Sequence, residues 1–179
     1  MSLDFSKLFT TLQTRFGDAI LSTSEFRSQQ VLRVKRESIL AVMTFLRDDA
    51  SAKFEMLTDV TCVDGLRLPT DMQKEFTERF AVVYQLTSIS QNARLRVKAY
   101  VSEDPCEIDS VSGVWDSANW GEREAYDLFG VVFKGHPDLK RILMPDNYEG
   151  HPLRKDYPLK GRGERDNFPK FNYAQAQGF

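Results

Sequence analysis

The chain has 179 residues, 41% of them apolar, which suits one folded domain with at most a short appendage. Its 24 basic and 26 acidic residues give a formal net charge of −2, so no overall field would attract nucleic acid or anionic lipid. Two cysteines are too few for an iron–sulfur ferredoxin or a cysteine-rich zinc module, no apolar run approaches the ~20 residues of a membrane span, and the N-terminus lacks the apolar region of a signal peptide. We therefore expect a cytoplasmic protein.

The first regular elements are a helix, a pair of strands and a second helix. Apolar residues recur every 3.6 positions over residues 3–16, and Gly17 follows as a helix stop. Residues 19–26 and 30–35 are expected to form a strand pair. From Ser38 the helical spacing returns as a second amphipathic stripe.

Three further strands are predicted at 54–66, 80–88 and 93–102, and the turn 89–92 joins the last two as a hairpin. Basic and apolar residues alternate along 93–102, so one face of that strand is wet and the other is buried. The order of elements predicts the α+β class: a mostly antiparallel mixed sheet with helices on one side, followed by a long irregular C-terminal arm.

A third helix is predicted over residues 119–130. Asn119 and Glu122 have the spacing of a capping box, which would place the helix start at Asn119. Gly130 lies where a left-handed C-terminal cap would be needed.

The composition changes after residue 135, where five of the seven prolines and both histidines lie. We therefore divide the chain into an α+β domain, 1–134, and an extended partner-binding arm, 135–179. Prolines remove backbone donors and restrain their neighbours, so the arm cannot form regular elements. From composition alone, an arm laid on another subunit and an arm wrapped on its own domain are equally favoured. Its apolar anchors are Tyr148, Leu153, Tyr157, Leu159, Phe168, Phe171 and Tyr173.

The third helix carries a cluster of charges, Glu122, Arg123, Glu124 and Asp127. Arg123 and Asp127 are i,i+4 neighbours, which predicts an ion pair on one helix face. Paired carboxylates can perform acid–base chemistry, but an arginine between them favours structural or interfacial pairing.

The remaining motifs give no active site. His136 and His151 each precede a proline, and hydrogen bonds to the backbone are favoured over a metal site that would need a third ligand. Residues 161–165 lack the spacing of a phosphate loop. Cys62 lies within a strand pattern and is expected to be buried, and Cys106 follows a proline in a polar turn.

Residues 120–159 resemble one known family. The run WGEREAYDLFG at 120–130 is followed by GHPDL at 135–139, RIL at 141–143 and GHPLRKDYPL at 150–159. This pattern resembles the 30-kDa subunit, also called the C subunit, of respiratory complex I, the proton-translocating NADH–quinone oxidoreductase. The signature residues expected at interfaces are Glu122, Arg123, Glu124, Asp127, Phe129, Gly130, His136, Pro137, Arg141, His151, Pro152, Arg154, Lys155 and Asp156.

The resemblance implies a structural subunit of the peripheral arm of an enzyme, with no catalytic, cofactor-binding or metal-binding residue of its own. FMN and iron–sulfur clusters would lie in partner subunits, which carry electrons from NADH to quinone. The implied partners are the D subunit, which lines the quinone site, and the iron–sulfur subunits B and I, on the cytoplasmic side of the cell inner membrane. The resemblance also favours contact of the C-terminal arm with partners. Membrane-bound hydrogenases and ferredoxin-dependent assemblies use homologous subunits and are the alternative.

Overall fold

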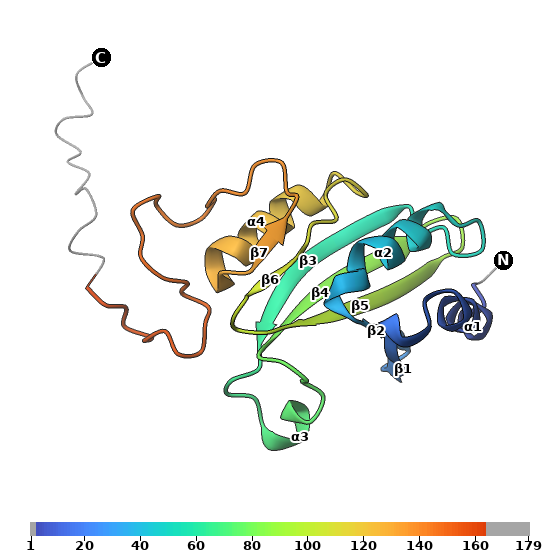
Figure 1. The fold of residues 1–179 in the computed structure, drawn as a ribbon, viewed down its shortest axis with the longest axis horizontal. Helices are drawn as coiled ribbons and strands as arrows, with labels where there is room; N and C mark the ends of the chain where they lie inside the picture. The colour runs from blue at the N-terminus through green and yellow to red at the C-terminus, as the bar shows by residue number, and fades with distance from the viewer. Residues whose placement is uncertain (1–2, 164–179) are drawn as a thin grey trace, which may run out of the picture.

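A computed structural model describes residues 3–163 of the chain, and Figure 1 shows their fold. A five-stranded sheet forms one layer, and helices cover one of its faces. The elements in chain order are α1 (Phe5–Phe16), β1 (Ile20–Phe26), β2 (Gln29–Val34), α2 (Ile39–Asp48), β3 (Met56–Asp64), α3 (Thr70–Gln73), β4 (Phe80–Ser88), β5 (Ala93–Val101), β6 (Glu107–Asp109), α4 (Ala118–Phe129) and β7 (Val132–Lys134).

The strands of the main sheet lie in the order β1-β2-β5-β4-β3. All neighbours are antiparallel except β2 and β5, which are parallel, so the predicted mostly antiparallel mixed sheet is confirmed. The hairpin between β4 and β5 turns at residues 89–92, as the polar sequence there predicts. The short β6 and β7 form a separate parallel pair that no sequence pattern indicated.

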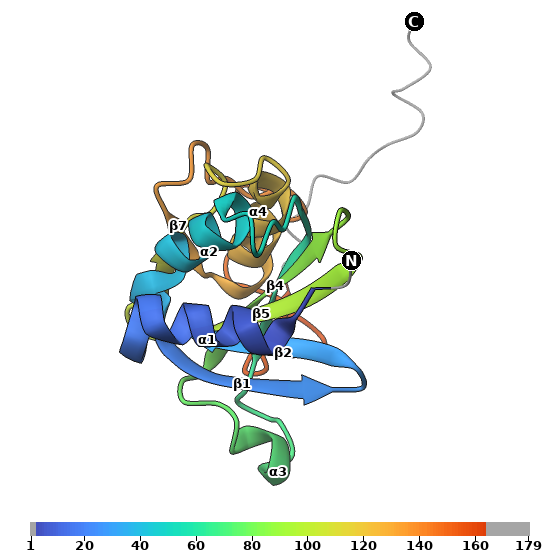
Figure 2. The ribbon, with the colours of Figure 1, turned by 90° about the vertical axis from the view of Figure 1, so that its right-hand side faces the viewer.

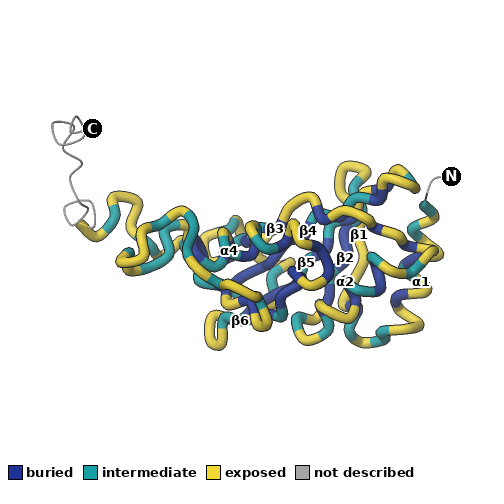
Figure 3. The backbone as a smooth tube through the Cα atoms, turned by 90° about the horizontal axis from the view of Figure 1, so that it is seen from above, coloured by how far each residue is buried: buried dark blue, intermediate teal, exposed yellow. Residues whose placement is uncertain are grey.

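The hydrophobic core lies between the sheet and three helices. Leu12 of α1, Met43 of α2 and Ala125 of α4 pack in one cluster with Tyr84 and Leu95 of the sheet. Figure 3 shows the burial concentrated in the central strands. The alternation in β5 has the predicted result, because its basic side chains lie on the face without these helices.

Helix α4 begins one residue earlier than predicted, and the capping box is wrong. Ser117 precedes the first turn and its side chain makes no capping hydrogen bond, while Asn119 lies inside the helix. Glu122 is completely buried and bonds to a neighbouring loop, so it cannot reach back to cap the helix. At the other end the prediction is confirmed: Gly130 has φ 77° and ψ 25°, the left-handed conformation of a C-cap.

Residues 135–163 follow an irregular path beside α4, at the left of Figure 1. The predicted anchors Phe168, Phe171 and Tyr173 lie outside the described residues.

Candidate functional site

Five of the signature residues meet where the C-terminal half of α4 contacts residues 136–157, a region we name the α4–arm junction: Asp127, Gly130, Arg141, His151 and Arg154. Asp127 is its centre and is fully buried. Its Oδ1 accepts a hydrogen bond from Arg141 Nη1 at 2.7 Å. Its Oδ2 accepts from the backbone N–H groups of Ile142, Leu143 and Met144 at 3.0, 2.7 and 2.9 Å.

These contacts keep the Asp127 carboxylate ionised. Burial alone raises the pKa of a carboxyl, but the backbone N–H donors and the Arg141 guanidinium outweigh it and leave the pKa of Asp127 below its usual value. Arg141 also donates to the Gly150 carbonyl at 3.1 Å. The Asp127 carboxylate therefore holds residues 142–144 of the arm directly, and it holds Gly150 through Arg141.

The arm also completes the hydrogen bonding of the α4 C-terminus. The last carbonyls of a helix lack partners within the helix. Here the Asp127 carbonyl accepts from His151 Nδ1 at 2.9 Å, the Leu128 carbonyl from Leu153 N at 3.1 Å, and the Phe129 carbonyl from Arg154 Nε at 2.6 Å. Arg154 adds a positive charge at the negative end of the helix dipole.

Gly130 is required at this point for two reasons. Its positive φ is costly for residues with a Cβ. A Cβ there would also lie 2.5 Å from His151 Nε2 and 3.0 Å from Arg154 Nη2. The C-cap thus leaves just enough room for the arm to dock.

A second ion pair, which sequence reasoning missed, holds the arm to the end of β3. Buried Asp64 accepts from Arg79 Nη2 at 2.9 Å and from Lys155 N at 2.9 Å. Arg79 also pairs with Asp156 at 2.9 Å. Burial raises the pKa of Asp64, but Arg79 and the backbone donors outweigh that effect and lower it. Asp64 and Lys155 are 91 positions apart, so no local sequence pattern indicates their contact.

The predicted ion pair between Arg123 and Asp127 is wrong. Asp127 faces the interior and pairs with Arg141 instead. Arg123 lies toward the surface, where its Nε donates to the Lys140 carbonyl at 3.1 Å and its guanidinium stacks 5.0 Å from the Trp120 ring. Residues four positions apart on a helix can form an ion pair. Here Asp127 is buried against Arg141 while Arg123 lies toward the surface, so the two side chains do not pair.

Glu122, the other buried carboxyl of α4, lies inside the domain. Its Oε1 accepts from Val111 N at 2.7 Å, and its Oε2 is 2.5 Å from the Ser110 hydroxyl, which donates. Among residues 3–163 it makes no ion pair. Burial raises its pKa to about 7, although the Ser110 and Val111 bonds act in the opposite direction. The Tyr84 hydroxyl, which interacts electrostatically with Glu122, is buried and has no hydrogen-bond partner in the part of the chain that the structure describes.

The two histidines bond to the backbone, as predicted. His136 Nε2 lies 3.2 Å from the Asn119 carbonyl and His151 Nδ1 bonds to Asp127. Burial, with Arg154 and Arg141 nearby, lowers the pKa of His151. Within the described part of the chain, no group of three His, Cys, Asp or Glu residues could hold a metal ion. Cys62 is buried, as predicted, and burial raises the pKa of its thiol.

The other signature residues have simpler surroundings. Phe129 belongs to the core, Pro152 is half-buried, and Glu124, Pro137, Lys155 and Asp156 have exposed side chains. Up to residue 156 the arm bonds to its own domain, which was one of the two paths left open by composition. The same residues leave apolar side chains in solvent, so these bonds do not exclude a partner.

A family model described as "Respiratory-chain NADH dehydrogenase, 30 Kd subunit" matches residues 32–163. The C subunit of the NADH-quinone oxidoreductase of Geotalea uraniireducens is 49% identical over 150 residues, covering 84% of this chain and 85% of the relative. The corresponding C subunit of Citrifermentans bemidjiense is 51% identical over 150 residues, covering 84% of this chain and 87% of the relative.

Two solved structures share the fold. A trypsin-resistant fragment of Nqo5 is 32% identical, with a TM-score of 0.63, covering 74% of this chain and 99% of the fragment. A chain of an archaeal membrane-bound sulfane sulfur reductase has a TM-score of 0.69 at 19% identity, covering 94% of this chain and 96% of that one. The second likeness concerns the fold alone.

Proposed function

The chain belongs to the respiratory-chain NADH dehydrogenase 30 Kd subunit family, and on that premise we propose that it is a non-catalytic assembly subunit in the peripheral arm of an NADH–quinone oxidoreductase. Its role is to hold neighbouring subunits in place while they pass electrons from NADH to quinone. FMN and the iron–sulfur clusters belong to those neighbours. Its partners are the D subunit at the quinone site and the iron–sulfur subunits B and I.

The observation that carries this proposal is the way the α4–arm junction presents apolar side chains. Asp127 and Asp64 fix the backbone of an irregular segment, yet Leu143 and Leu153 on that segment are 54% and 45% exposed. Trp120, at the start of α4, is 64% exposed. A rigid backbone that holds large apolar groups in water suits a surface that another protein covers.

The assembly is proposed to lie on the cytoplasmic side of the cell inner membrane, with this chain as a peripheral subunit. No helix within residues 3–163 has the length and apolar character needed to cross a bilayer. Attachment would therefore come through the partner subunits.

Affinity purification of the tagged chain from its native membranes tests the proposal. Wild-type chain is expected to bring down the subunits that carry FMN and iron–sulfur clusters. Leu143→Asp should reduce their yield, because a charge would be buried at the proposed contact. Ile89→Asp is the matched control: Ile89 is 69% exposed in the β4–β5 turn, away from the junction. Recovery of the chain alone, or equal losses in both variants, would contradict the proposal.

The same purification addresses the alternative, a homologous subunit of a membrane-bound hydrogenase or a ferredoxin-dependent assembly. The fold shared with the sulfane sulfur reductase complex is compatible with either assembly. An FMN-containing, NADH-oxidising subunit among the partners identifies NADH as the donor. Hydrogenase activity, or reduction by ferredoxin without that subunit, would favour the alternative.

A further inference from the structure

Within residues 3–163, strand β1 forms an open edge of the main sheet. At the opposite edge, α4 packs along β3, so closely that a Cβ on Gly121 would lie 2.9 Å from Val60 Cβ. In contrast, six of the seven residues of β1 are exposed. Figure 2 shows β1 running beside β2 at the edge of the sheet. Among the described strands, β1 pairs only with β2. Edge strands present unpaired N–H and C=O groups that can bind another extended chain.

The register identifies which backbone groups of β1 are available. β1 and β2 are joined by the two-residue turn Arg27-Ser28, whose φ angles are 50° and 62°, so Phe26 and Gln29 close the hairpin. Closing pairs of such hairpins exchange both of their hydrogen bonds, and bonded and non-bonded pairs then alternate. The N–H and C=O groups of Thr23 and Glu25 therefore point away from β2.

β1 also lacks the usual protection of an exposed edge. Natural edge strands often carry lysine, proline or inward-pointing charges that prevent pairing. β1 is seven residues long, contains neither lysine nor proline, and has Glu25 as its one charge. Its bulge, between Ile20 and Ser22, lies at the start and leaves the remainder regular. Leu21 and Phe26 are 44% and 62% exposed at its two ends.

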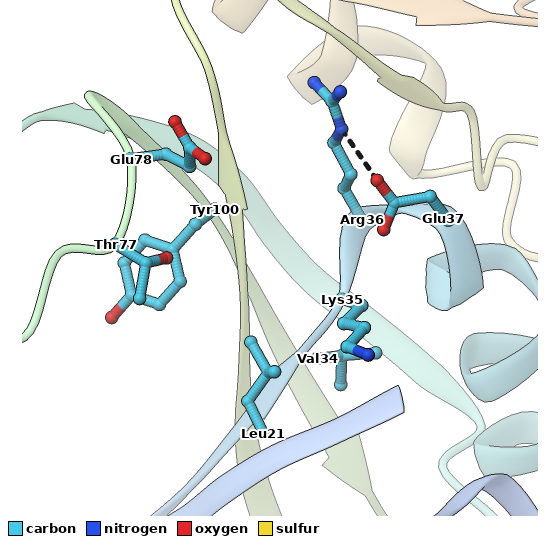
Figure 4. A pocket seen from close by; sticks show the side chains of 8 residues that line it. All are labelled: Leu21, Val34, Lys35, Arg36, Glu37, Thr77, Glu78 and Tyr100. Atoms are coloured by element: carbon cyan, nitrogen blue, oxygen red, sulfur yellow. Dashed lines mark hydrogen bonds and ion pairs between the residues drawn. The ribbon is translucent and has the colours of Figure 1, made fainter. Parts of the chain in front are cut away.

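A cavity of about 280 Å³ lies beside Leu21, between β1, the end of β2 and the loop after α3 (Figure 4). Leu21, which is 44% exposed, lines it together with the largely buried Tyr100. Around them stand charges of both signs, with Arg36 and Glu37 already paired at 3.0 Å. A strand that binds an edge gains affinity from its backbone bonds and selectivity from a pocket for one of its side chains. The cavity and the open edge together provide both.

We propose that an extended strand of a neighbouring subunit pairs with β1 and places an apolar side chain in the cavity beside Leu21. The backbone of that strand bonds to Thr23 and Glu25 and extends the sheet. This inference rests on the proposed function, which supplies the neighbour, and it concerns a surface separate from the α4–arm junction.

A second copy of this chain is a poorer fit than a neighbouring subunit. A two-fold antiparallel pairing of β1 with itself must match the outward residues Thr23 and Glu25 in one of three registers. These registers place Glu25, Arg27 or Gln29 of the other copy opposite Leu21. None of these side chains is apolar, so a second copy would place no apolar side chain in the cavity beside Leu21.

Amide hydrogen exchange, measured on the isolated full chain and on the purified assembly, tests this inference. The amides of Thr23 and Glu25 should exchange at least about tenfold more slowly in the assembly, because they gain hydrogen bonds there. Ser24, which bonds to β2, is the internal control and should be protected in both samples. Equal rates for Thr23 and Glu25 in both samples would overturn the inference and leave the proposed function intact.

A proline variant gives a second readout. Thr23→Pro removes an outward N–H without breaking the β1–β2 ladder, so the isolated chain should fold, and its yield of assembly should fall at least about fivefold. Thr23→Val keeps both the N–H and the branched side chain and should assemble normally. Normal assembly of a folded Thr23→Pro chain would overturn the inference. Concentration-dependent protection of the isolated chain would assign the edge to a second copy and also overturn it. A wild-type chain that recovers no assembly contradicts the proposed function itself.

Discussion

The middle and the C-terminal end of α4 each bury a carboxyl group, Glu122 in the middle and Asp127 at the end. At Asp127 an arginine and three backbone N–H groups surround the carboxylate and lower its pKa. At Glu122 a serine hydroxyl and one backbone N–H are the donors, and burial raises the pKa to about 7. The pKa values of two acids on one helix thus shift in opposite directions, because only Asp127 has a cation and several N–H donors around its carboxylate.

The largest effect is expected from Asp127→Ala, which removes the charged centre of the α4–arm junction. It leaves three backbone donors without their acceptor and Arg141 with only carbonyl partners among the described residues, so the free energy of unfolding should fall by about 3–5 kcal/mol. Urea denaturation of the purified chain measures this. Glu124→Ala, on an exposed position of the same helix, should change stability by no more than about 0.5 kcal/mol. Similar values for the two variants would refute the role assigned to Asp127.

The next largest effect concerns pH and Glu122. Its folded-state pKa of about 7 exceeds the ordinary value of 4.5, so the folded state binds the proton more tightly. Stability should therefore decline by about 3 kcal/mol as the pH rises from 4.5 to 7, and level off above 7. Glu122→Gln should abolish this decline, since its amide can serve both Ser110 and Val111. Urea denaturation of wild type and Glu122→Gln at several pH values between 4.5 and 7 checks this. An equal decline in the two proteins would mean that Glu122 is not responsible.

The opposite sign is expected for Asp127. Because its pKa is lowered in the folded state, its contribution is present above the ordinary pKa of 3.8 and disappears as the pH falls through the folded-state value. The same denaturation series, extended to acid, should show a larger loss in Glu122→Gln than in Asp127→Ala, because Asp64, whose pKa is also lowered, remains in both variants.

A smaller effect is expected at the C-cap glycine, where a positive φ and the lack of space for a Cβ both disfavour other residues. Two alanine variants measure these two costs separately. Gly135→Ala at φ 79° meets no atom within 4 Å and should cost about 1 kcal/mol for its backbone conformation alone. Gly130→Ala should cost about 1–2 kcal/mol more, because the added Cβ would displace His151 and Arg154. Equal unfolding free energies for the two variants would mean that docking of the arm adds nothing at this position.

The smallest change in stability is expected from Arg123→Ala, about 1 kcal/mol, since among the described residues its side chain makes hydrogen bonds only to the Lys140 and Arg141 carbonyls. Its effect on assembly should be larger, because loss of the guanidinium also frees the exposed Trp120 ring. Quantifying the assembled complex in membranes of the variant checks this. Wild-type amounts of assembled complex in the variant would mean that Arg123 is not part of the proposed interface.

Most of the regular elements were predictable because their patterns are local. The 3.6-residue spacing identified α1 and α2, and β-branched and aromatic runs identified β3, β4 and β5. The start of α4 was less secure: Asn119 and Glu122 satisfied a capping pattern, yet burial against residues 110–112 drew the Glu122 carboxyl away. The short β6 gave no signal because three residues carry no measurable period.

The sequence by itself determined the family signature, the amphipathic helices, the two-sided strand β5 and the need for glycine at position 130. Only the tertiary structure decided which groups Asp127 and Glu122 meet. The physical reason is that both carboxyls accept hydrogen bonds from backbone N–H groups, three at Asp127 and one at Glu122, and such groups belong to every residue except proline and therefore leave no mark in the sequence. Likewise, Asp64 and Lys155 became neighbours only when the chain brought the end of β3 to the arm.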